Sequence, residues 1–184
     1  MEVKTFRFDD ININEDLEKT IKIASFVKSR IPNAKIIFCI SPMVHDMSSE
    51  GGKESERIFP KIFNAYSDHR IFYKVDLCGV PPVPDWIETA GHGLFHMDHR
   101  LLTREGQEMS IVSSCSLSKS SIFVPPFNKW NSDTEKVCKE FGIELVKFED
   151  GWLCCEYNAF TEEQGLWYLQ AREFTLEQFK QWLK

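Results

Sequence analysis

Apolar segments of strand length alternate along the chain with segments of helical periodicity. Residues 3–8 alternate apolar and polar side chains, and residues 35–40 are almost wholly apolar. Between them, residues 15–31 place Leu17, Ile21, Ala24, Val27 and Ile31 on one helical face, with Asn14 as the expected cap and Pro32 after the end. This order is typical of α/β proteins with a parallel sheet or barrel. With 184 residues, we expect one domain spanning positions 1–184.

The rest of the chain continues the alternation. Further strands are expected at residues 86–90, 122–124, 144–148, 152–156 and 166–170, and helices at 57–66, 101–117, from 132 until just before Gly142, from 161 and from 175. The segment Ser132-Asp-Thr-Glu135 is a capping-box pattern. Residues 41–55 are polar and contain glycines, which is typical of a functional or mobile loop, and we expect them to form a rim or lid.

Two adjacent carboxylates, Asp9 and Asp10, follow the first expected strand. In α/β architectures the carboxyl ends of the strands carry functional residues. Taken alone, however, an Asp-Asp pair is more often a turn or a helix cap. His92 and His96 lie four residues apart after another expected strand, on one helical face or across a strand-to-helix corner. An isolated pair of this kind is also commonly structural.

Together, these residues predict a metal-dependent hydrolase. Two histidines and one carboxylate make a three-ligand site that leaves a position for water, and the metal would lower the pKa of that water. The second carboxylate would then act as the base. His99 could be a ligand or a support, and we favour the support. We do not expect a zinc protease, because Gly93 stands where the H-E-x-x-H motif needs its glutamate.

Composition and charge narrow the class of partner. The net charge is −6 with a pI near 5.4, and the basic residues are scattered, which argues against nucleic-acid binding. The N-terminus lacks the pattern of a signal peptide and no run of 18 apolar residues occurs, so we expect a cytoplasmic protein without a membrane span. The six cysteines show no C-x-x-C spacing and are expected to be reduced and mostly buried.

The segments that carry these residues resemble motifs of a known family. Phe6-Arg-Phe-Asp9-Asp10 resembles the T-F-D-D motif, and His92-Gly-Leu-Phe-His96 resembles the H-[ST]-x-x-[HD] motif, of NodB-type polysaccharide deacetylases (carbohydrate esterase family four). The resemblance spans most of the chain and implies a distorted, partly open (β/α) barrel. It implies that Asp9 is the general base. Asp10, His92 and His96 would bind one divalent metal, with zinc as the expected ion.

A third segment suggests the substrate groove. Residues 122–130 resemble the family's R-x-P-[FY] segment, which implies that Pro126, Phe127, Asn128 and Trp130 bind substrate. Residues 92–102 and 125–131 look especially like an intracellular subgroup associated with O-antigen and surface-glycan biosynthesis. The implied substrate is an N-acetylated sugar on a nucleotide-linked or lipid-linked glycan precursor, from which the acetyl group is removed.

Two positions depart from the family pattern. Val124 stands where the family has an arginine that orients the base, and Arg100 or Lys129 are the candidates to replace it. Gln170 stands where the family has a histidine that protonates the leaving amine, a role that an amide cannot fill. Glu173 is a candidate replacement acid if burial raises its pKa, although an ion pair with the preceding arginine is an equally good interpretation.

These departures keep two other functions open. One is a degenerate member of the fold that binds metal or sugar without turnover. The other is a different metal-dependent amide or ester hydrolase that uses the same residues, because a fold does not fix the leaving group.

Overall fold

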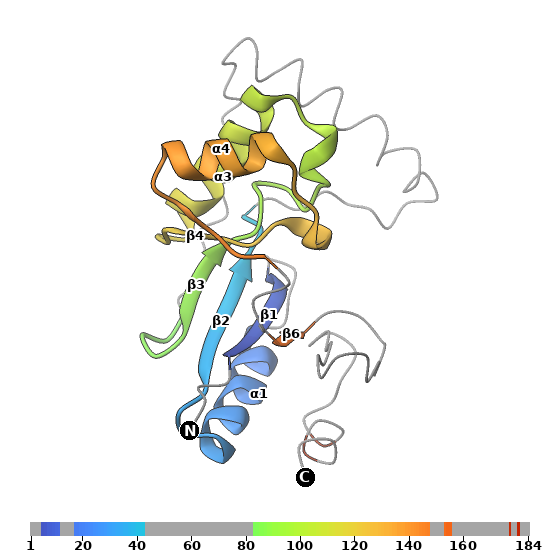
Figure 1. Ribbon diagram of the computed structural model, residues 1–184. Coiled ribbons are helices and arrows are strands. Elements are labelled where there is room, and N and C mark those ends of the chain that lie inside the picture. Colours follow the sequence, from blue (N-terminus) through green and yellow to red (C-terminus); the bar gives the residue numbers. More distant parts are fainter. Residues whose placement is uncertain are drawn as a thin grey trace, which may run out of the picture.

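The computed structural model describes residues 5–11, 17–42, 83–147 and 153–155, together with Glu177 and Lys180. Six strands of these residues form one parallel sheet in the order β5-β4-β3-β2-β1-β6 (Figure 1). The strands are β1 (Thr5–Ile11), β2 (Lys35–Ile40), β3 (Glu88–Gly91), β4 (Ile122–Phe123), β5 (Glu144–Leu145) and β6 (Leu153–Cys155). The predicted α/β class with a parallel sheet is confirmed. The closure of the sheet into a partly open barrel stays a prediction.

The helices flank the two halves of the sheet. The longer ones are α1 (Leu17–Arg30), α3 (Arg104–Leu117) and α4 (Ser132–Glu140), and the 3-10 turns are η1 (His99–Leu101) and η2 (Pro126–Asn128). Helix α1 lies along β1 and β2, whereas α3 and α4 lie side by side near β3 and β4 (Figure 1).

Helix starts differ slightly from the sequence prediction. The segment expected as one helix from residue 101 is the turn η1 followed by α3, because Thr103 Oγ1 accepts a hydrogen bond from Gly106 N–H at 3.2 Å and starts a new helix there. Helix α4 is capped by Asn131, one residue before the expected capping box, and Thr134 completes that box.

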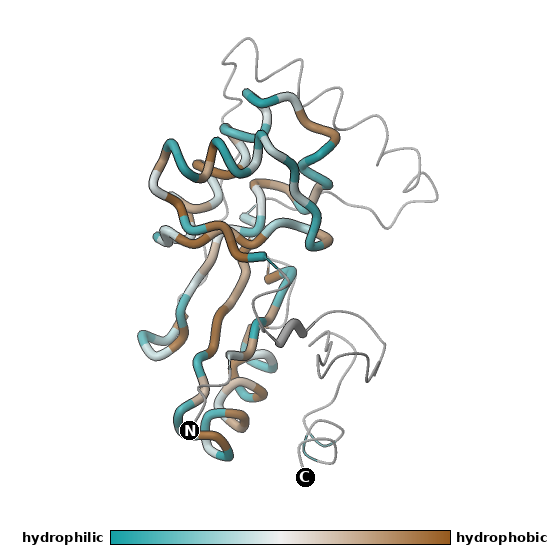
Figure 2. Tube along the Cα trace, in the orientation of Figure 1, coloured by the Kyte–Doolittle hydropathy of each residue, from teal (hydrophilic) through white to brown (hydrophobic). Residues whose placement is uncertain are grey.

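Hydrophobic packing covers both faces of the sheet, as expected for parallel strands. On one face, Phe6, Phe8 and Phe38 pack with Ala24 and Val27 of α1. The other face carries Ile37, Cys39, Ala90, Val124 and Val146. Figure 2 shows β2 as a nearly continuous hydrophobic stretch, whereas α1 mixes hydrophobic and hydrophilic positions. The run at residues 35–40 was therefore correctly predicted as a buried strand.

Strand β1 contains an irregularity at the two carboxylates. Phe8 pairs with Phe38 and Ile11 with Ile40, so two residues of β1 lie opposite the single Cys39 of β2. Asp10 has φ 60° within this bulge. Neighbouring side chains of a regular strand point to opposite faces, and the bulge interrupts that alternation between Asp9 and Asp10.

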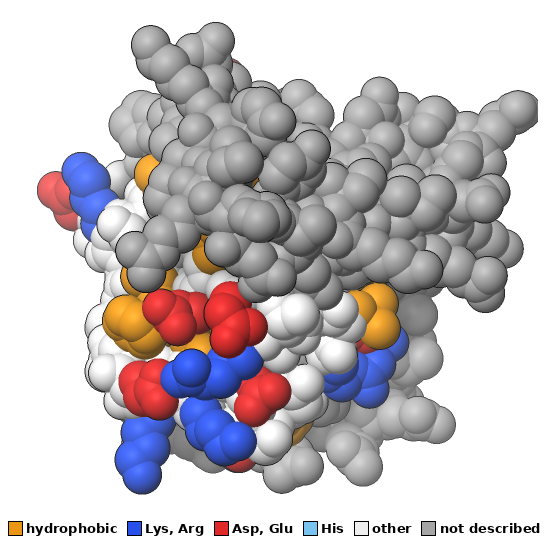
Figure 3. Space-filling model, turned by 90° about the horizontal axis from the view of Figure 1, so that it is seen from above, with side chains coloured by type: hydrophobic (Ala, Val, Ile, Leu, Met, Phe, Trp, Pro, Cys, Tyr) orange, Lys and Arg blue, Asp and Glu red, His pale blue; other side chains and the backbone are white. Residues whose placement is uncertain are grey.

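On part of the described surface, charges of both signs lie next to one another. Figure 3 shows acidic and basic side chains next to one another on the face seen from above. Arg104 pairs with Glu140 and Lys136 with Asp133, and all four side chains are solvent-accessible. Three cysteines, Cys39, Cys115 and Cys138, are buried thiols as predicted. Within the described ranges, no helix has the length and apolar character needed to cross a membrane.

Candidate functional site

Three ligand-type atoms converge at the carboxyl ends of β1 and β3. Asp10 Oδ1 lies 3.5 Å from His92 Nε2 and 2.9 Å from His96 Nε2. All three ligand atoms lie within 4.8 Å of one another. Asp10 comes from the bulge of β1, His92 follows Gly91 at the end of β3, and His96 lies in the following loop. The two histidines thus meet across a strand-to-loop corner, whereas the sequence predicted one helical face or a strand-to-helix corner.

The neighbours of His92 fix which of its nitrogens faces the cluster. Its Nδ1 lies 2.8 Å from the carbonyl oxygen of Val124. A carbonyl can only accept a hydrogen bond, so Nδ1 carries the proton and, in the neutral ring, Nε2 presents a lone pair. Fully buried His92 is therefore held in the tautomer that a metal ligand requires.

The geometry of the three atoms fits a metal site. Nitrogen and oxygen ligands about 2.1 Å from a tetrahedral ion lie about 3.4 Å from one another. The Asp10 oxygen lies 3.5 Å from His92 Nε2, close to this value, and 2.9 Å from His96 Nε2, which is shorter. The Nε2 atom of His96 is buried and makes no hydrogen bond to any described residue, although Asp10 Oδ1 is 2.9 Å away. A cation shared with Asp10 would give this nitrogen a partner. The set Asp-His-His suits zinc and similar divalent ions.

The electrostatics of Asp10 favour its charged form. Burial by itself disfavours ionisation of this carboxyl, but interactions with His92 and His96 outweigh that effect and lower its pKa well below the usual range. Asp10 is therefore a carboxylate at neutral pH, the form in which an aspartate binds a cation.

Two glycines shape the corner that carries His92. A Cβ at Gly91 would lie 2.7 Å from Cys115 Sγ and 2.9 Å from Cys115 N, so Gly91 allows β3 to pack closely against α3. Gly93 has φ +77°, and a Cβ there would lie 2.7 Å from the Phe95 carbonyl oxygen. The glutamate of a zinc-protease motif would not fit at this position.

His99 supports the loop between the two candidate ligands. It is fully buried, and its Nδ1 donates to the Met97 carbonyl at 3.1 Å. Its Nε2 lies 3.0 Å from Ser110 Oγ, which also accepts a hydrogen bond from Leu94 N–H at 2.9 Å. Burial lowers the pKa of His99 to about 3, so the ring is neutral and accepts the Ser110 proton. These contacts agree with the expected supporting role.

The carboxylate next to the cluster is held by an arginine from its own strand. Arg7 Nε lies 2.8 Å from Asp9 Oδ1 and Arg7 Nη2 lies 2.7 Å from Asp9 Oδ2, and both side chains are fully buried. The same Nη2 donates to Asn128 Oδ1 at 2.7 Å. The two residues share one side of β1 because side chains at i and i+2 of a strand point the same way.

This contact corrects the expectation that Arg100 or Lys129 replaces the missing family arginine. Arg100 instead forms an ion pair with Asp98, with Nη2 2.7 Å from Oδ2, and Lys129 lies 3.9 Å from the same oxygen. Sequence reasoning missed Arg7, although the chain carries a signal for it. That signal is a basic and an acidic residue two positions apart in a strand flanked by phenylalanines.

The residues expected to bind substrate take different positions. Phe127 is 43% exposed, and the centre of its ring lies 4.3 Å from that of the His96 ring. Pro126 is buried beside Gly93, and Asn128 contacts Arg7. Trp130 is half-buried with Lys147 Nζ 5.9 Å from its ring centre. Of the four, Phe127 is the one that combines exposure with contact to the candidate metal site.

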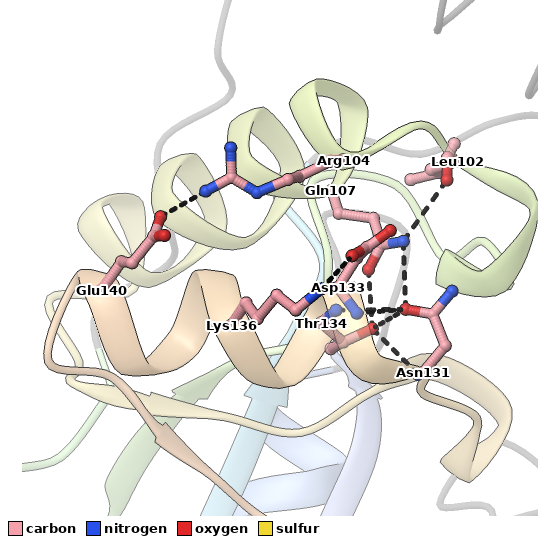
Figure 4. A network of polar contacts seen from close by, with 8 residues as sticks. All are labelled: Leu102, Arg104, Gln107, Asn131, Asp133, Thr134, Lys136 and Glu140. Atoms are coloured by element: carbon pink, nitrogen blue, oxygen red, sulfur yellow. Dashed lines mark hydrogen bonds and ion pairs between the residues drawn. The ribbon is translucent and has the colours of Figure 1, made fainter.

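A buried polar network holds the loop that carries these residues (Figure 4). Thr134 Oγ1 donates to Gln107 Oε1 at 2.6 Å, and Gln107 Nε2 donates to Asn131 Oδ1 and to the Leu102 carbonyl, each at 3.3 Å. Asn131 also caps α4. The network therefore joins α3, the start of α4 and the end of the loop after β4.

Other expectations lie outside the described residues. These are Glu173, Gln170, the Asn14 cap, most of the loop at 41–55, the helices at 57–66, 161 and 175, and the strand at 166–170.

Comparison with known proteins finds solved structures that are similar to this chain. No family model and no curated protein matches the sequence. A family 4 carbohydrate esterase from Streptomyces lividans, in complex with acetate, is similar with a TM-score of 0.46 and 12% identity over 78% of this chain and 61% of that chain. A CE4 family pseudoenzyme from Bacillus anthracis is similar with a TM-score of 0.45 and 14% identity, over 78% of this chain and 43% of that chain.

The Xyl-CE4 domain of a multidomain xylanase from the hindgut metagenome of Trinervitermes trinervoides is similar with a TM-score of 0.40 and 14% identity. The match covers 73% of this chain and 54% of that chain. The chain thus spans less than two thirds of the length of each of these proteins.

Proposed function

We propose that this protein is a metal-dependent deacetylase that removes the acetyl group from an N-acetylated sugar. The observation that carries the proposal is a carboxylate clamped by an arginine, Asp9, directly adjacent in sequence to a cluster with metal-ligand geometry. Amide hydrolysis needs a cation to polarise the carbonyl and a base to take a proton from water, and the two halves of this site are suited to these tasks.

Asp10, His92 and His96 would hold the ion. When bound, a divalent ion such as zinc would supply Lewis-acid polarisation of the acetyl carbonyl and a lowered pKa for water. Asp10 brings the negative charge, while His92 is kept with its Nε2 lone pair toward the cluster by the Val124 carbonyl. The buried hydrogen bonds of His99 hold the loop that carries His96.

Asp9 would be the general base. The bidentate contact with Arg7 fixes the plane of the carboxylate and offsets the cost of burying it as an anion. Both oxygens of Asp9 accept from Arg7, and carboxylate oxygens have a second lone pair with which to receive a proton from water. Glu173 remains our proposed proton donor to the leaving amine.

Phe127 would contact the sugar. Its exposed ring next to His96 offers an apolar face to the C–H surface of a pyranose at the point where an acetamide would reach the cluster. Pro126, Asn128 and Trp130 belong to the same proposed groove. We further propose a nucleotide-linked or lipid-linked glycan precursor as the substrate and a distorted, partly open barrel as the complete fold.

A substrate panel tests the function. Protein reconstituted with zinc, manganese or cobalt is assayed for acetate release from N-acetylated sugars, sugar nucleotides and acetyl esters. Turnover of acetamido sugars that is lost in Asp9→Asn but kept in the distant control Asp133→Asn is expected. Turnover of esters alone would identify a different hydrolase. No release from any substrate would reject the deacetylase.

One observation favours a second candidate function. Gln170 stands where the resembled family has its proton-donating histidine, so a sugar- or metal-binding protein without turnover is the alternative. Gln170→His distinguishes the two. A gain of deacetylation would show that only the donor is missing, whereas no gain together with retained metal binding would favour the binding protein.

A further inference from the structure

Two consecutive residues of the loop after β4 adopt a strained backbone conformation. Phe127 has φ 56° and Asn128 has φ 53°, which places both in the left-handed region that non-glycine residues rarely occupy. Such strain persists only where surrounding contacts enforce it. The side-chain contacts of these two residues are therefore the ones to consider as holding the turn in this conformation.

That contact is the hydrogen bond from Arg7 Nη2 to Asn128 Oδ1 at 2.7 Å. The same nitrogen lies 2.7 Å from Asp9 Oδ2, so one guanidinium nitrogen serves both residues. Arg7 is fully buried and cannot exchange either partner for bulk water. Any displacement of Asn128 consequently acts on the group that orients Asp9.

The other strained residue touches the opposite side of the site. The Phe127 ring lies 4.3 Å from the ring of His96, whose Nε2 belongs to the ligand-type cluster. The turn thus contacts the proposed base through Asn128 and Arg7, and a proposed ligand through Phe127.

From these contacts we infer that Asn128 is a positioning residue: through Arg7 it couples the conformation of the substrate-facing turn to the orientation of Asp9. This inference rests on the proposed function for its catalytic consequence. A substrate that seats on Phe127 would in this way stabilise the turn in which Asp9 is correctly aligned. Asn128 itself need not touch the substrate.

A kinetic cycle with Asn128→Gly and Arg7→Lys tests the coupling. Glycine accepts the left-handed backbone but lacks the amide, and lysine keeps the charge but not the bidentate fork. Because small misplacements of a catalytic group cost up to about 100-fold in rate, Asn128→Gly is expected to lower kcat about 10- to 100-fold with metal content unchanged. Adding Asn128→Gly to Arg7→Lys should lower kcat no further. Retained kcat in Asn128→Gly, or effects that multiply in the double variant, would overturn the inference.

A stability cycle makes the test independent of turnover. Lys119 is a matched control, since its φ is 52° at the end of α3, outside the site. Lys119→Gly relieves backbone strain and should raise the midpoint of urea unfolding, whereas Asn128→Gly also loses the part-buried hydrogen bond to Arg7 and should lower it. In the Arg7→Lys background the loss caused by Asn128→Gly should disappear.

The two cycles separate the possible failures. An inactive wild type with a non-additive stability cycle rejects the proposed function but keeps the coupling between Asn128 and Arg7. An additive stability cycle rejects the coupling whether or not the wild type is active.

Discussion

Arg7 and Asp9 lie two residues apart on β1 and form a bidentate ion pair with distances of 2.8 and 2.7 Å. Both side chains are fully buried, so each charge depends on the other for solvation. The motif resemblance instead predicted an orienting arginine at the position of Val124. Here β1 supplies both the carboxylate and the group that orients it.

Removing Arg7 is predicted to destabilise the protein strongly. Arg7→Met leaves the Asp9 carboxylate buried without its cation, and we expect a loss of about 3–5 kcal/mol in the free energy of unfolding. Arg7→Met/Asp9→Asn removes both charges and should regain much of that loss. Urea unfolding of the three proteins checks the prediction, which fails if the double variant is less stable than Arg7→Met.

Replacing Gly93, in the loop that follows β3, is predicted to cost more stability than replacing Gly142, which has open space around it. Gly142 has φ +64° and no described atom lies within 4 Å of the position that a Cβ would take, so Gly142→Ala should cost about 1–2 kcal/mol through backbone strain alone. Gly93→Ala combines the same strain with a contact of 2.7 Å to the Phe95 carbonyl and should cost more. Thermal unfolding ranks the two variants; equal losses would mean that the close approach at Gly93 is not tight.

His99 is predicted to make stability fall in acid. Its pKa is lowered to about 3, whereas an unfolded histidine has a pKa of about 6.5, so the unfolded chain binds the extra proton between these values. The stability contributed by neutral His99 is complete above the higher value and declines as the pH falls. Going from about pH 7.5 to 5 should cost about 2 kcal/mol from this residue.

The variant His99→Gln isolates that contribution. Its stability should be lower at neutral pH because the hydrogen bonds to Met97 and Ser110 are altered, but its dependence on pH should be flatter than that of the wild type. Identical slopes in both proteins would contradict a neutral, buried His99.

Phe127→Ala is predicted to affect substrate binding more than folding. With 43% of its surface exposed, Phe127 contributes little to the core, so the free energy of unfolding should change by less than about 1 kcal/mol. Loss of the aromatic face should raise KM about tenfold on an acetamido sugar. Phe141, which is 47% exposed and caps the end of α4, is the matched control. A similar rise of KM in Phe141→Ala would argue against a specific sugar contact.

Several features of the fold could be predicted from local sequence. The apolar run at residues 36–40 was predictable as a strand because five consecutive apolar residues between a helix and a polar loop have the length of a buried strand. The alternation before Asp9 and Asp10 correctly placed them near the carboxyl end of β1, although the strand was expected to stop before them and instead continues to Ile11. The bulge that separates the two carboxylates was not predictable, because it depends on register against β2.

The partners of charged residues were not predictable in the same way. Arg7 lies between Phe6 and Phe8, as a solvent-facing strand residue would, but it is buried and donates a hydrogen bond to Asn128, which is 121 positions away in the sequence. The cap of α4 was misplaced by one residue because Asn131 and Ser132 are both good caps, and the contact of Asn131 with Gln107 favours the former. Contacts between residues so far apart in the sequence can be identified only from the tertiary structure.

The metal content and metal affinity of protein purified without chelators test the central claim most directly. Wild type and the control Asp133→Asn should bind one divalent ion per chain, while Asp10→Ala and His92→Ala should lose it and Asp9→Asn should keep it. Absence of binding in the wild type after reconstitution, or unchanged affinity in Asp10→Ala and His92→Ala, would contradict the account.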